Sequence, residues 1–335
     1  MSIKIGINGF GRIGRLAFRS ALENDGVEIL AINDLADSKA LAFLLKYDSV
    51  FRTLKSEIKA EEDILKVDER TIRAHSLRDP AKLPWRQLGV EVAIESTGRF
   101  RAREDAAKHL EAGAKKVLVS APMSNPDITL MLGINEENYD PDRHHVISMA
   151  SCTTNAVVPV LKVLNDEFDI IKGVFTTIHA YTNDQRLLDT IHSDLRRARA
   201  AALNIIPTTT GAARAVAQVL PELDGKLEAL AIRVPVPDVS LIDLIVEVGQ
   251  EVTAERVNNS LREVSRGSFK DLMDFVEEPL VSQDFIGNPH LSIVDGLLTR
   301  VVDGNLVKVV TWYDNEWGYA SKLIELIVRV LSRGL

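Results

Sequence analysis

The chain contains a single cysteine, Cys152, so it cannot form an internal disulfide. A chain without disulfides suits a reducing compartment, and we expect a cytoplasmic protein. No apolar run approaches the ~20 residues that a membrane-spanning helix needs, and Met1 to Lys4 lead straight into a strand-like run, so neither a membrane span nor a secretory leader is expected. Lys and Arg number 40 against 48 Asp and Glu, and this net charge of −8 argues against a dedicated nucleic-acid site.

The remaining composition is that of a folded globular protein. Apolar residues make up 46% and charged residues 26% of the 335 positions, which excludes general disorder. A length of this size favours two domains. The sequence has no internal repeat and no linker rich in proline or glycine, so the expected boundary near residue 150 is a change of pattern.

Short apolar segments alternate with amphipathic helices in residues 1–150. Strands are expected at 3–7, 27–32, 90–94 and 116–119, and helices at 12–24, 38–46 and 102–113. This alternation is typical of βαβ units and predicts an α/β domain with a parallel sheet. Residues 52–76 carry more charge, and we expect antiparallel strands there.

The second half has a different pattern. Helices are expected at 152–164 and 211–220 and from about Ser321, and strands at 171–179, 227–236, 239–248 and 305–313. A long polar connection over 180–210 is expected to be functional or to cover a neighbouring subunit. The pattern predicts an α+β domain with a mixed or antiparallel sheet over 151–315, while the C-terminal helix, within 316–335, packs back on the first domain.

A glycine motif follows the first strand. Gly9, Gly11 and Gly14 form GxGxxG, which here opens a helix. The three glycines permit a tight turn, close approach of a pyrophosphate, and close packing of helix on strand. Asp34 follows the second strand and suits the ribose 2′-hydroxyl of NAD. The motif in this context predicts a Rossmann-type dinucleotide-binding domain.

Cys152 and His179 are the candidate reactive pair. Cys152 stands where a helix begins, a position that favours a thiolate, and His179 ends the next expected strand. From the residues alone, a buried structural cysteine and a structural histidine remain alternatives. His144 and His145 are adjacent, so their side chains would point to opposite faces of a strand, and no metal site is expected.

Hydroxyls and arginines form a candidate anion site. Thr208, Thr209 and Thr210 precede Gly211 at a helix start, which suits a phosphate. The candidate cations are Arg196, Arg197 and Arg233. A solvated or inter-subunit surface is the alternative for residues 196–199.

Together these residues resemble phosphorylating glyceraldehyde-3-phosphate dehydrogenases. The resemblance covers nearly the whole chain, in the order of the family. It is carried by residues 6–15 (GINGFGRIGR), 151–155 (SCTTN), 179–182 (HAYT), 204–213 (NIIPTTTGAA), 233–235 (RVP) and 312–316 (WYDNE).

The resemblance implies a homotetramer that oxidises D-glyceraldehyde 3-phosphate to 1,3-bisphosphoglycerate with NAD and inorganic phosphate. It implies that Cys152 is the nucleophile and His179 the base. Thr182 and Arg233 match the site of the substrate's own phosphate, and the site of the attacking phosphate matches Ser151, Thr153, Arg197, Thr210 and Gly211. Arg196 also remains a candidate for that second site. Besides the glycines, the matched cofactor positions are Arg12, Ile13, Asp34, Arg78, Ser120 and Asn315.

The sequence departs from the family at several positions. A second cysteine is common four residues after the nucleophile, where this chain has Ala156, and the usual asparagine before the nucleophile is Met149. A usual His-Gly pair is replaced at residues 51–52 by Phe-Arg. Thr190-Ile191 replaces a Leu-Pro found in strict NAD enzymes, whereas Leu35 after Asp34 matches them. We therefore expect NAD to be preferred with relaxed discrimination, so that NADP is used to a lesser extent.

Three other functions compete with this one. An erythrose-4-phosphate dehydrogenase tends to lose the Thr-Thr-Gly motif, which is retained at 209–211. A catalytically inactive binding protein would not need Cys152 and His179. A cysteine hydrolase would not need the glycine motif or Asp34.

Overall fold

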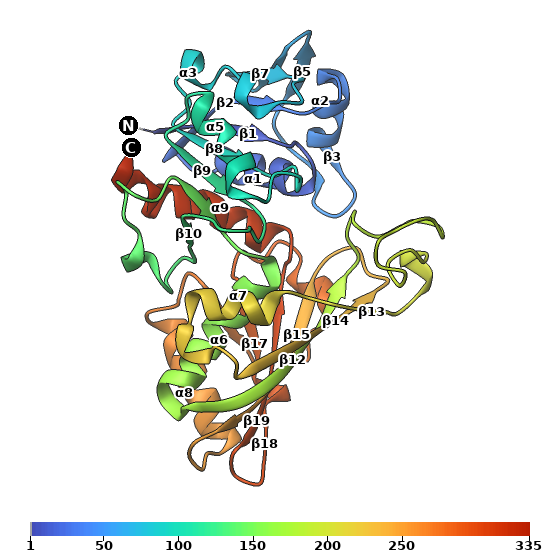
Figure 1. Ribbon diagram of the computed structural model, residues 1–335. Helices are drawn as coiled ribbons and strands as arrows, with labels where there is room; N and C mark the ends of the chain where they lie inside the picture. The colour runs from blue at the N-terminus through green and yellow to red at the C-terminus, as the bar shows by residue number, and fades with distance from the viewer. Residues whose placement is uncertain (1) are drawn as a thin grey trace. The chain divides into compact units, whose positions relative to one another are not determined.

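The computed structural model describes residues 2–335, which contacts divide into two compact units. One unit comprises the residues up to Ala150 together with Ala320–Leu335, and the other comprises Ser151–Tyr319 (Figure 1). The division after Ala150 falls where the sequence pattern changes. None of the helices in the described part of the chain combines the length and the apolar character that crossing a bilayer requires.

The first unit is built on one large sheet, in the order β10-β11-β9-β8-β1-β2-β7-β6-β5. Parallel pairing joins β10 (Ile128–Thr129), β11 (Val146–Ser148), β9 (Lys116–Val119), β8 (Val92–Glu95), β1 (Ile3–Asn8), β2 (Val27–Asn33) and β7 (Arg70–His75). Strands β6 (Ile64–Val67) and β5 (Ile58–Glu61) extend the sheet antiparallel. The central strands are buried on both faces, as expected for a parallel sheet covered by helices. The predicted Rossmann-type architecture is confirmed, with its antiparallel extension.

Helices of the first unit begin largely where the sequence predicts. Helix α1 spans Arg12–Leu22 and α2 spans Ser38–Lys46, and Asp37 caps α2 by accepting a hydrogen bond from the Ala40 N–H at 2.8 Å. The single helix expected over 102–113 is instead two short ones, α4 (Arg103–Ala106) and α5 (Lys108–Glu111), because the chain tightens at Ala107 (φ −62°, ψ −16°). A further short helix, α3, covers Trp85–Leu88, and a two-stranded ribbon joins β3 (Tyr47–Asp48) to β4 (Arg52–Thr53).

The second unit contains a mixed sheet, in the order β13-β14-β12-β15-β19-β17-β16, with β18 also paired to β19. Its strands are β12 (Ile170–Ala180), β13 (Ile206–Thr208), β14 (Leu227–Val234), β15 (Ser240–Val248), β16 (Met273–Val276), β17 (Ser292–Asp295), β18 (Arg300–Val302) and β19 (Leu306–Tyr313). Only the β12–β14 and β16–β17 pairs are parallel. The predicted mixed sheet is confirmed.

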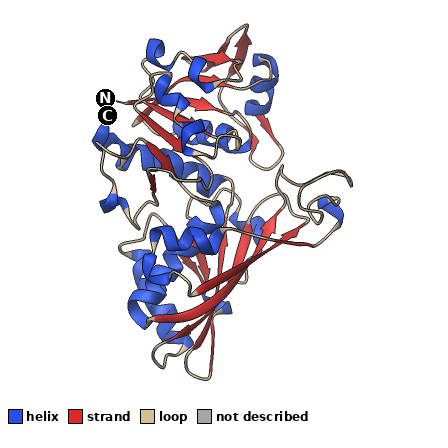
Figure 2. Cartoon of the chain, viewed as in Figure 1, coloured by secondary structure: helices blue, strands red, loops and turns tan. Residues whose placement is uncertain are grey.

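Three helices, α6 (Cys152–Phe168), α7 (Ala212–Val219) and α8 (Ala254–Arg266), cover one face of this sheet (Figures 1 and 2). Strand β15 alternates strictly between buried and half-buried residues, as a strand covered on one face must. The sequence did not predict α8, whose charged composition leaves only Val257, Leu261 and Ser265 buried. The last helix, α9 (Trp317–Arg329), begins four residues before the expected Ser321.

Candidate active site

The glycine turn of the first unit has the geometry that a dinucleotide needs. Gly9 has φ +93°, which favours glycine, and a side chain there would meet the Thr97 backbone nitrogen at 2.5 Å. A Cβ on Gly14 would lie 2.0 Å from the Gly9 carbonyl oxygen, so helix α1 packs as closely as a glycine allows. Gly11 has no atom within 4 Å of its Cβ position, and no side chain caps the α1 N-terminus there. The turn and helix start therefore fit a diphosphate group.

Asp34 lies next to this turn. Its Oδ2 accepts a hydrogen bond from the Phe10 N–H at 2.8 Å, and its Oδ1 accepts from the Ala36 N–H at 3.3 Å. Because a carboxylate oxygen can accept more than one hydrogen bond, Asp34 still has capacity for a ribose hydroxyl. Ile13 is half-buried in the first turn of α1.

Arg12, a predicted cofactor residue, forms an ion pair with Asp48, and its guanidinium lies 5.7 Å from the centre of the Phe51 ring. Burial by itself would raise the pKa of Asp48, but the N–H groups of Phe51 and Val50 and the charge of Arg12 together lower it. Phe51 thus contacts Arg12 at a position where the sequence departs from the family.

The remaining predicted cofactor residues occupy different parts of the chain. Ser120 follows β9 and donates a hydrogen bond from its hydroxyl to the Glu95 carbonyl at 3.2 Å. Arg78 is exposed. Asn315 belongs to the second unit, where its Oδ1 accepts a hydrogen bond from the Ser240 hydroxyl at 2.7 Å.

The second unit places the predicted nucleophile at the first residue of α6. Ser151 caps this helix, and its Oγ accepts a hydrogen bond from the Thr154 N–H at 3.0 Å. Cys152 is half-buried, and its Sγ lies 3.4 Å from His179 Nε2. Burial raises the pKa of Cys152, while the Arg233 charge and the N–H groups of Thr153 and Cys152 oppose that rise. The structure therefore brings a thiol, an imidazole and a guanidinium together.

His179 is oriented through its other ring nitrogen. Nδ1 lies 2.7 Å from the Ala180 carbonyl oxygen and 2.8 Å from Arg233 Nη1, so it has both an acceptor and a donor within hydrogen-bond distance. Arg233 Nη1 donates to the same carbonyl at 2.9 Å. Nε2 faces the Cys152 Sγ. Burial and the nearby Arg233 charge lower the pKa of His179 to about 3.

Tyr313 supports this pair from β19. Its hydroxyl lies 3.0 Å from Thr153 Oγ1 and 2.8 Å from Thr177 Oγ1, and its ring meets the His179 ring edge-on at 5.9 Å. Burial raises the pKa of Tyr313. In the sequence, Tyr313 lies within the family-like segment 312–316, and its residue type alone indicated no role. The structure also directs the Thr153 hydroxyl toward Tyr313.

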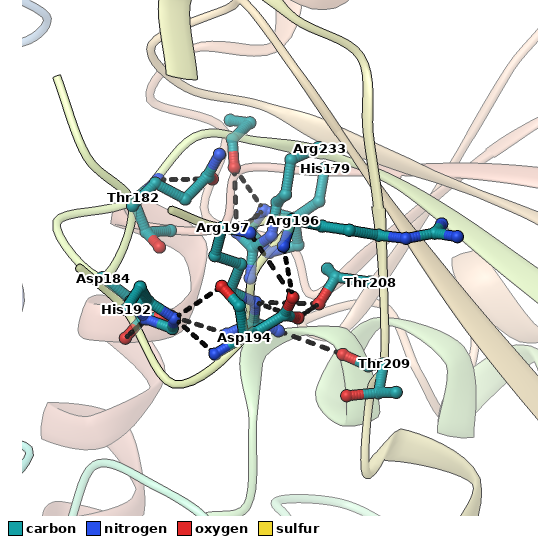
Figure 3. Close-up of polar contacts among 12 residues, drawn as sticks. His179, Thr182, Asp184, His192, Asp194, Arg196, Arg197, Thr208, Thr209 and Arg233 are labelled. Atoms are coloured by element: carbon teal, nitrogen blue, oxygen red, sulfur yellow. Dashed lines mark hydrogen bonds and ion pairs between the residues drawn. The ribbon is translucent and has the colours of Figure 1, made fainter. Parts of the chain in front are cut away.

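Arg197 lies at the centre of a polar cluster in the long connection (Figure 3). Its guanidinium donates to Thr208 Oγ1 at 2.9 Å, to the Thr209 carbonyl at 3.0 Å and to Asp184 at 2.6 Å. The Arg196 side chain extends away from this cluster and reaches only the Pro207 carbonyl, at 3.5 Å. Of the two arginines left open by the sequence, Arg197 is therefore the one placed among the threonines.

Several donors around this cluster are available to a ligand. Arg233 Nε is buried and has no hydrogen-bond partner, and the same is true of Gln185 Nε2, although Gln185 Oε1 accepts from the Thr182 N–H at 3.3 Å. At the start of α7, Thr210 Oγ1 accepts from the Ala212 N–H at 3.2 Å, and Gly211 has open space at its Cβ position. A buried N–H donor without a partner is costly, so the arrangement suits an anion that accepts from it.

Comparison with known proteins gives a consistent result over the full chain. Residues 3–103 match the family model described as the NAD binding domain of glyceraldehyde 3-phosphate dehydrogenase, and residues 151–315 match the C-terminal domain of that enzyme. The chain is 55% identical to glyceraldehyde-3-phosphate dehydrogenase of Geobacillus stearothermophilus over 335 residues, covering 100% of both chains. It is 56% identical to glyceraldehyde-3-phosphate dehydrogenase 1 of Bacillus subtilis over 335 residues, again covering 100% of both. Identity to glyceraldehyde-3-phosphate dehydrogenase 2 of Bacillus subtilis is 49% over 333 residues, covering 99% of this chain and 98% of the relative.

Proposed function

The chain belongs to the glyceraldehyde-3-phosphate dehydrogenase family and catalyses NAD-dependent oxidation of glyceraldehyde 3-phosphate, and we propose that Cys152 is its nucleophile and His179 its base. The observation that carries this assignment is the 3.4 Å approach of Cys152 Sγ to His179 Nε2 at the start of α6. A nucleophile within hydrogen-bond reach of a base, itself oriented by a third group, is the arrangement that covalent catalysis requires.

The glycine turn and Asp34 fit the cofactor. We assign the diphosphate to the α1 N-terminus at Gly11 and the adenosine ribose to Asp34. When bound, NAD supplies the acceptor for the hydride that leaves the substrate. Asp34 would repel a 2′-phosphate, so NADP is the poorer cofactor.

The first step is attack of Cys152 on the aldehyde carbon. His179 Nε2 takes the thiol proton, a carbon–sulfur bond forms, and His179 returns the proton to the aldehyde oxygen, which becomes the hydroxyl of a hemithioacetal. His179 then accepts the proton of that hydroxyl as the hydride leaves, and Cys152 holds a thioester. Arg233, whose Nε is buried without a partner, would bind the substrate's own phosphate together with Thr182.

The second step releases the product. Inorganic phosphate, held by Arg197, Thr210 and Gly211, attacks the thioester carbon, the carbon–sulfur bond breaks, and 1,3-bisphosphoglycerate leaves. The Cys152 N–H and His179 would stabilise the oxyanion of this tetrahedral intermediate. Ser151 and Thr153 complete the proposed phosphate site, although both hydroxyls already have partners within the chain.

We also propose that the protein is a cytoplasmic homotetramer. The long connection exposes large apolar side chains, namely Leu187, Leu188, Ile191, Leu195, Leu203 and Ile205, each at least 70% exposed. The sheet face opposite α6–α8 also exposes Val174. Apolar surface of this extent indicates contact with other subunits. Light scattering on the purified protein would measure the mass, and a monomer would contradict this assembly.

Absorbance at 340 nm tests the reaction. The protein, glyceraldehyde 3-phosphate and NAD are mixed with and without inorganic phosphate, beside a Cys152→Ser variant. We expect NADH production that depends on phosphate and falls by about 10⁴-fold or more in the variant. Reduction that ignores phosphate would indicate hydrolytic release of the acid, and an active variant would exclude Cys152 as the nucleophile.

A further inference from the structure

A buried polar network in the first unit is centred on two side chains that are assigned neither to substrate nor to cofactor. Its centre is Glu95, the last residue of β8, which is 1% exposed, and its second member is His109 on α5, which is fully buried. Glu95 Oε2 accepts from Asn8 Nδ2 at 2.6 Å and lies 3.1 Å from His109 Nε2. Glu95 Oε1 accepts from the Thr97 N–H at 2.8 Å and the Thr97 hydroxyl at 2.5 Å. A buried carboxylate needs several donors of this kind, and here it has four.

Trp85 determines which ring nitrogen of His109 carries the hydrogen. The indole Nε1 lies 2.9 Å from His109 Nδ1, and an indole N–H can only donate. Nδ1 must therefore accept, which leaves the hydrogen on Nε2, facing Glu95. The two rings are stacked at 6.2 Å, so the imidazole is also held in its plane. The Trp85–His109 contact thus makes His109 a fixed donor to Glu95.

The network continues to the end of two more strands. Asn33, the last residue of β2, donates from Nδ2 to Asn8 Oδ1 at 2.7 Å, and Asn8 is the last residue of β1. Asn33 also makes two hydrogen bonds to the backbone of Leu77. Its Oδ1 accepts from the Leu77 N–H at 2.8 Å, and its Nδ2 donates to the Leu77 carbonyl at 2.9 Å. The Glu95 carbonyl accepts from the Ser120 N–H at 3.0 Å.

Each of these anchor points is next to a residue of the proposed cofactor site. Asn8 precedes Gly9, Asn33 precedes Asp34, Leu77 precedes Arg78, and the Glu95 carbonyl binds Ser120 itself. The loop after Glu95 is also tied to the glycine turn, since the Ser96 hydroxyl donates to the Gly9 carbonyl at 2.7 Å. These backbone segments come from distant parts of the sequence, and one network of hydrogen bonds fixes their relative positions.

We infer that His109 and Glu95 are positioning residues that set the affinity of this protein for its dinucleotide. The inference rests on the proposed assignment of the cofactor residues. His109 touches none of them; it orients the Glu95 carboxylate, which in turn holds Asn8 and Thr97 on either side of Gly9. Loss of the His109 donor lets these segments separate by small amounts, and a dinucleotide that contacts all of them at once binds less tightly.

The test replaces His109 with Phe, which keeps a ring of similar shape but removes both nitrogens. We expect the Kd and KM for NAD to rise about tenfold, with kcat at saturating NAD and the KM for glyceraldehyde 3-phosphate unchanged. His109→Gln keeps an N–H donor and is expected to recover most of the affinity. Calorimetric titration with NAD alone measures the Kd without any reaction, so it remains informative even if the proposed chemistry fails.

Val117→Ala is the matched control. Val117 is a fully buried β9 residue of the same sheet and contacts none of the network side chains by hydrogen bond, so its truncation lowers the melting temperature without disturbing the strand ends. A His109→Phe protein that melts like Val117→Ala but keeps wild-type Kd for NAD would overturn the inference.

Trp85→Phe provides a second variant should His109→Phe fail to fold. It removes the N–H that fixes the His109 tautomer together with part of a fully buried ring, so its melting temperature is compared with that of Val117→Ala. We expect a smaller rise in the Kd for NAD, of about threefold, and an unchanged Kd in a folded Trp85→Phe protein would likewise overturn the inference.

Discussion

The two units hold their central polar groups in opposite ways. In the first unit, the Glu95 carboxylate has four donors, and both ring nitrogens of His109 have partners. In the second unit, Arg233 Nε and both carboxyl oxygens of Asp238 are buried with no hydrogen-bond partner. Burial and neighbouring charge lower the pKa of His179 to about 3 and raise that of Asp238 to about 9.

This difference separates a framework from a reactive site. A fully paired network is rigid and holds backbone at fixed positions, which suits the binding of a large cofactor. Unpartnered donors and shifted pKa values cost stability and are typical of sites where a substrate supplies the missing partner. Variants in the second unit should therefore change rates more than stability, and the following predictions examine that difference.

The largest effect is expected from His179→Asn. Loss of the base that faces Cys152 should lower kcat by about 10³-fold, while the Kd for NAD stays within twofold of wild type. Steady-state kinetics and calorimetric titration measure the two values. His192→Asn, a change at a half-buried histidine that contacts Asp184 and Asp194, is the control. A His179→Asn protein that kept a tenth of the wild-type kcat would contradict the assigned role.

Arg233→Leu should come next. The KM for glyceraldehyde 3-phosphate is expected to rise about 100-fold, because the buried Nε donor is lost. Alkylation of Cys152 by neutral iodoacetamide at pH 7 should also slow, since the Arg233 charge lowers the pKa of Cys152. Arg233→Lys keeps the charge but loses Nε, so it should restore the alkylation rate without restoring KM. An unchanged KM in Arg233→Leu would remove Arg233 from the phosphate site.

A smaller effect is expected at the cofactor site from Asp34→Asn. The amide oxygen can still accept from the Phe10 N–H, but the charge that repels a 2′-phosphate is gone. The ratio of kcat/KM for NADP to that for NAD should rise about tenfold. Asp34→Ala also removes the acceptor and should weaken both cofactors. Wild-type protein that used NADP as efficiently as NAD would refute the predicted preference.

The smallest effect concerns stability. The pKa of Asp238, about 9 in the folded protein, exceeds the unfolded value of about 3.9, so the folded state binds more protons and stability falls as pH rises between these values. The pKa of Asp314, raised to about 6, adds to this fall. Asp238→Asn should raise the melting temperature by about 3 °C at pH 9, with the gain disappearing toward pH 4.

Thermal unfolding followed by circular dichroism between pH 4 and pH 9 measures this effect. Glu263→Gln is the matched control, because it also removes one carboxylate but at an exposed position on α8. It should leave the pH dependence of the melting temperature unchanged. An Asp238→Asn protein with the wild-type pH dependence would show that Asp238 is not the group responsible.

The spacing of apolar residues along the chain predicted most of the helices and strands. Periodicity located β1, β2, α1 and α2, because a buried strand and an amphipathic helix leave different spacings of apolar residues. It missed β10, β11, β16 and β17, which have two to four residues each, although it located β8 and β9, which have four. It also missed α8, which buries only three residues and is otherwise largely polar.

The sequence by itself determined most of the helices and strands, the glycine turn with Asp34, and the candidates Cys152 and His179. Each of these depends on residue types within a short stretch of chain. Only the tertiary structure decided that Arg197 and not Arg196 lies among the threonines, that Tyr313 supports Thr153 from 160 residues away, and that Glu95 joins Asn8 across 87 residues. A hydrogen bond depends on distance and direction in space, and folding brings such distant residues together in ways that no local spacing records.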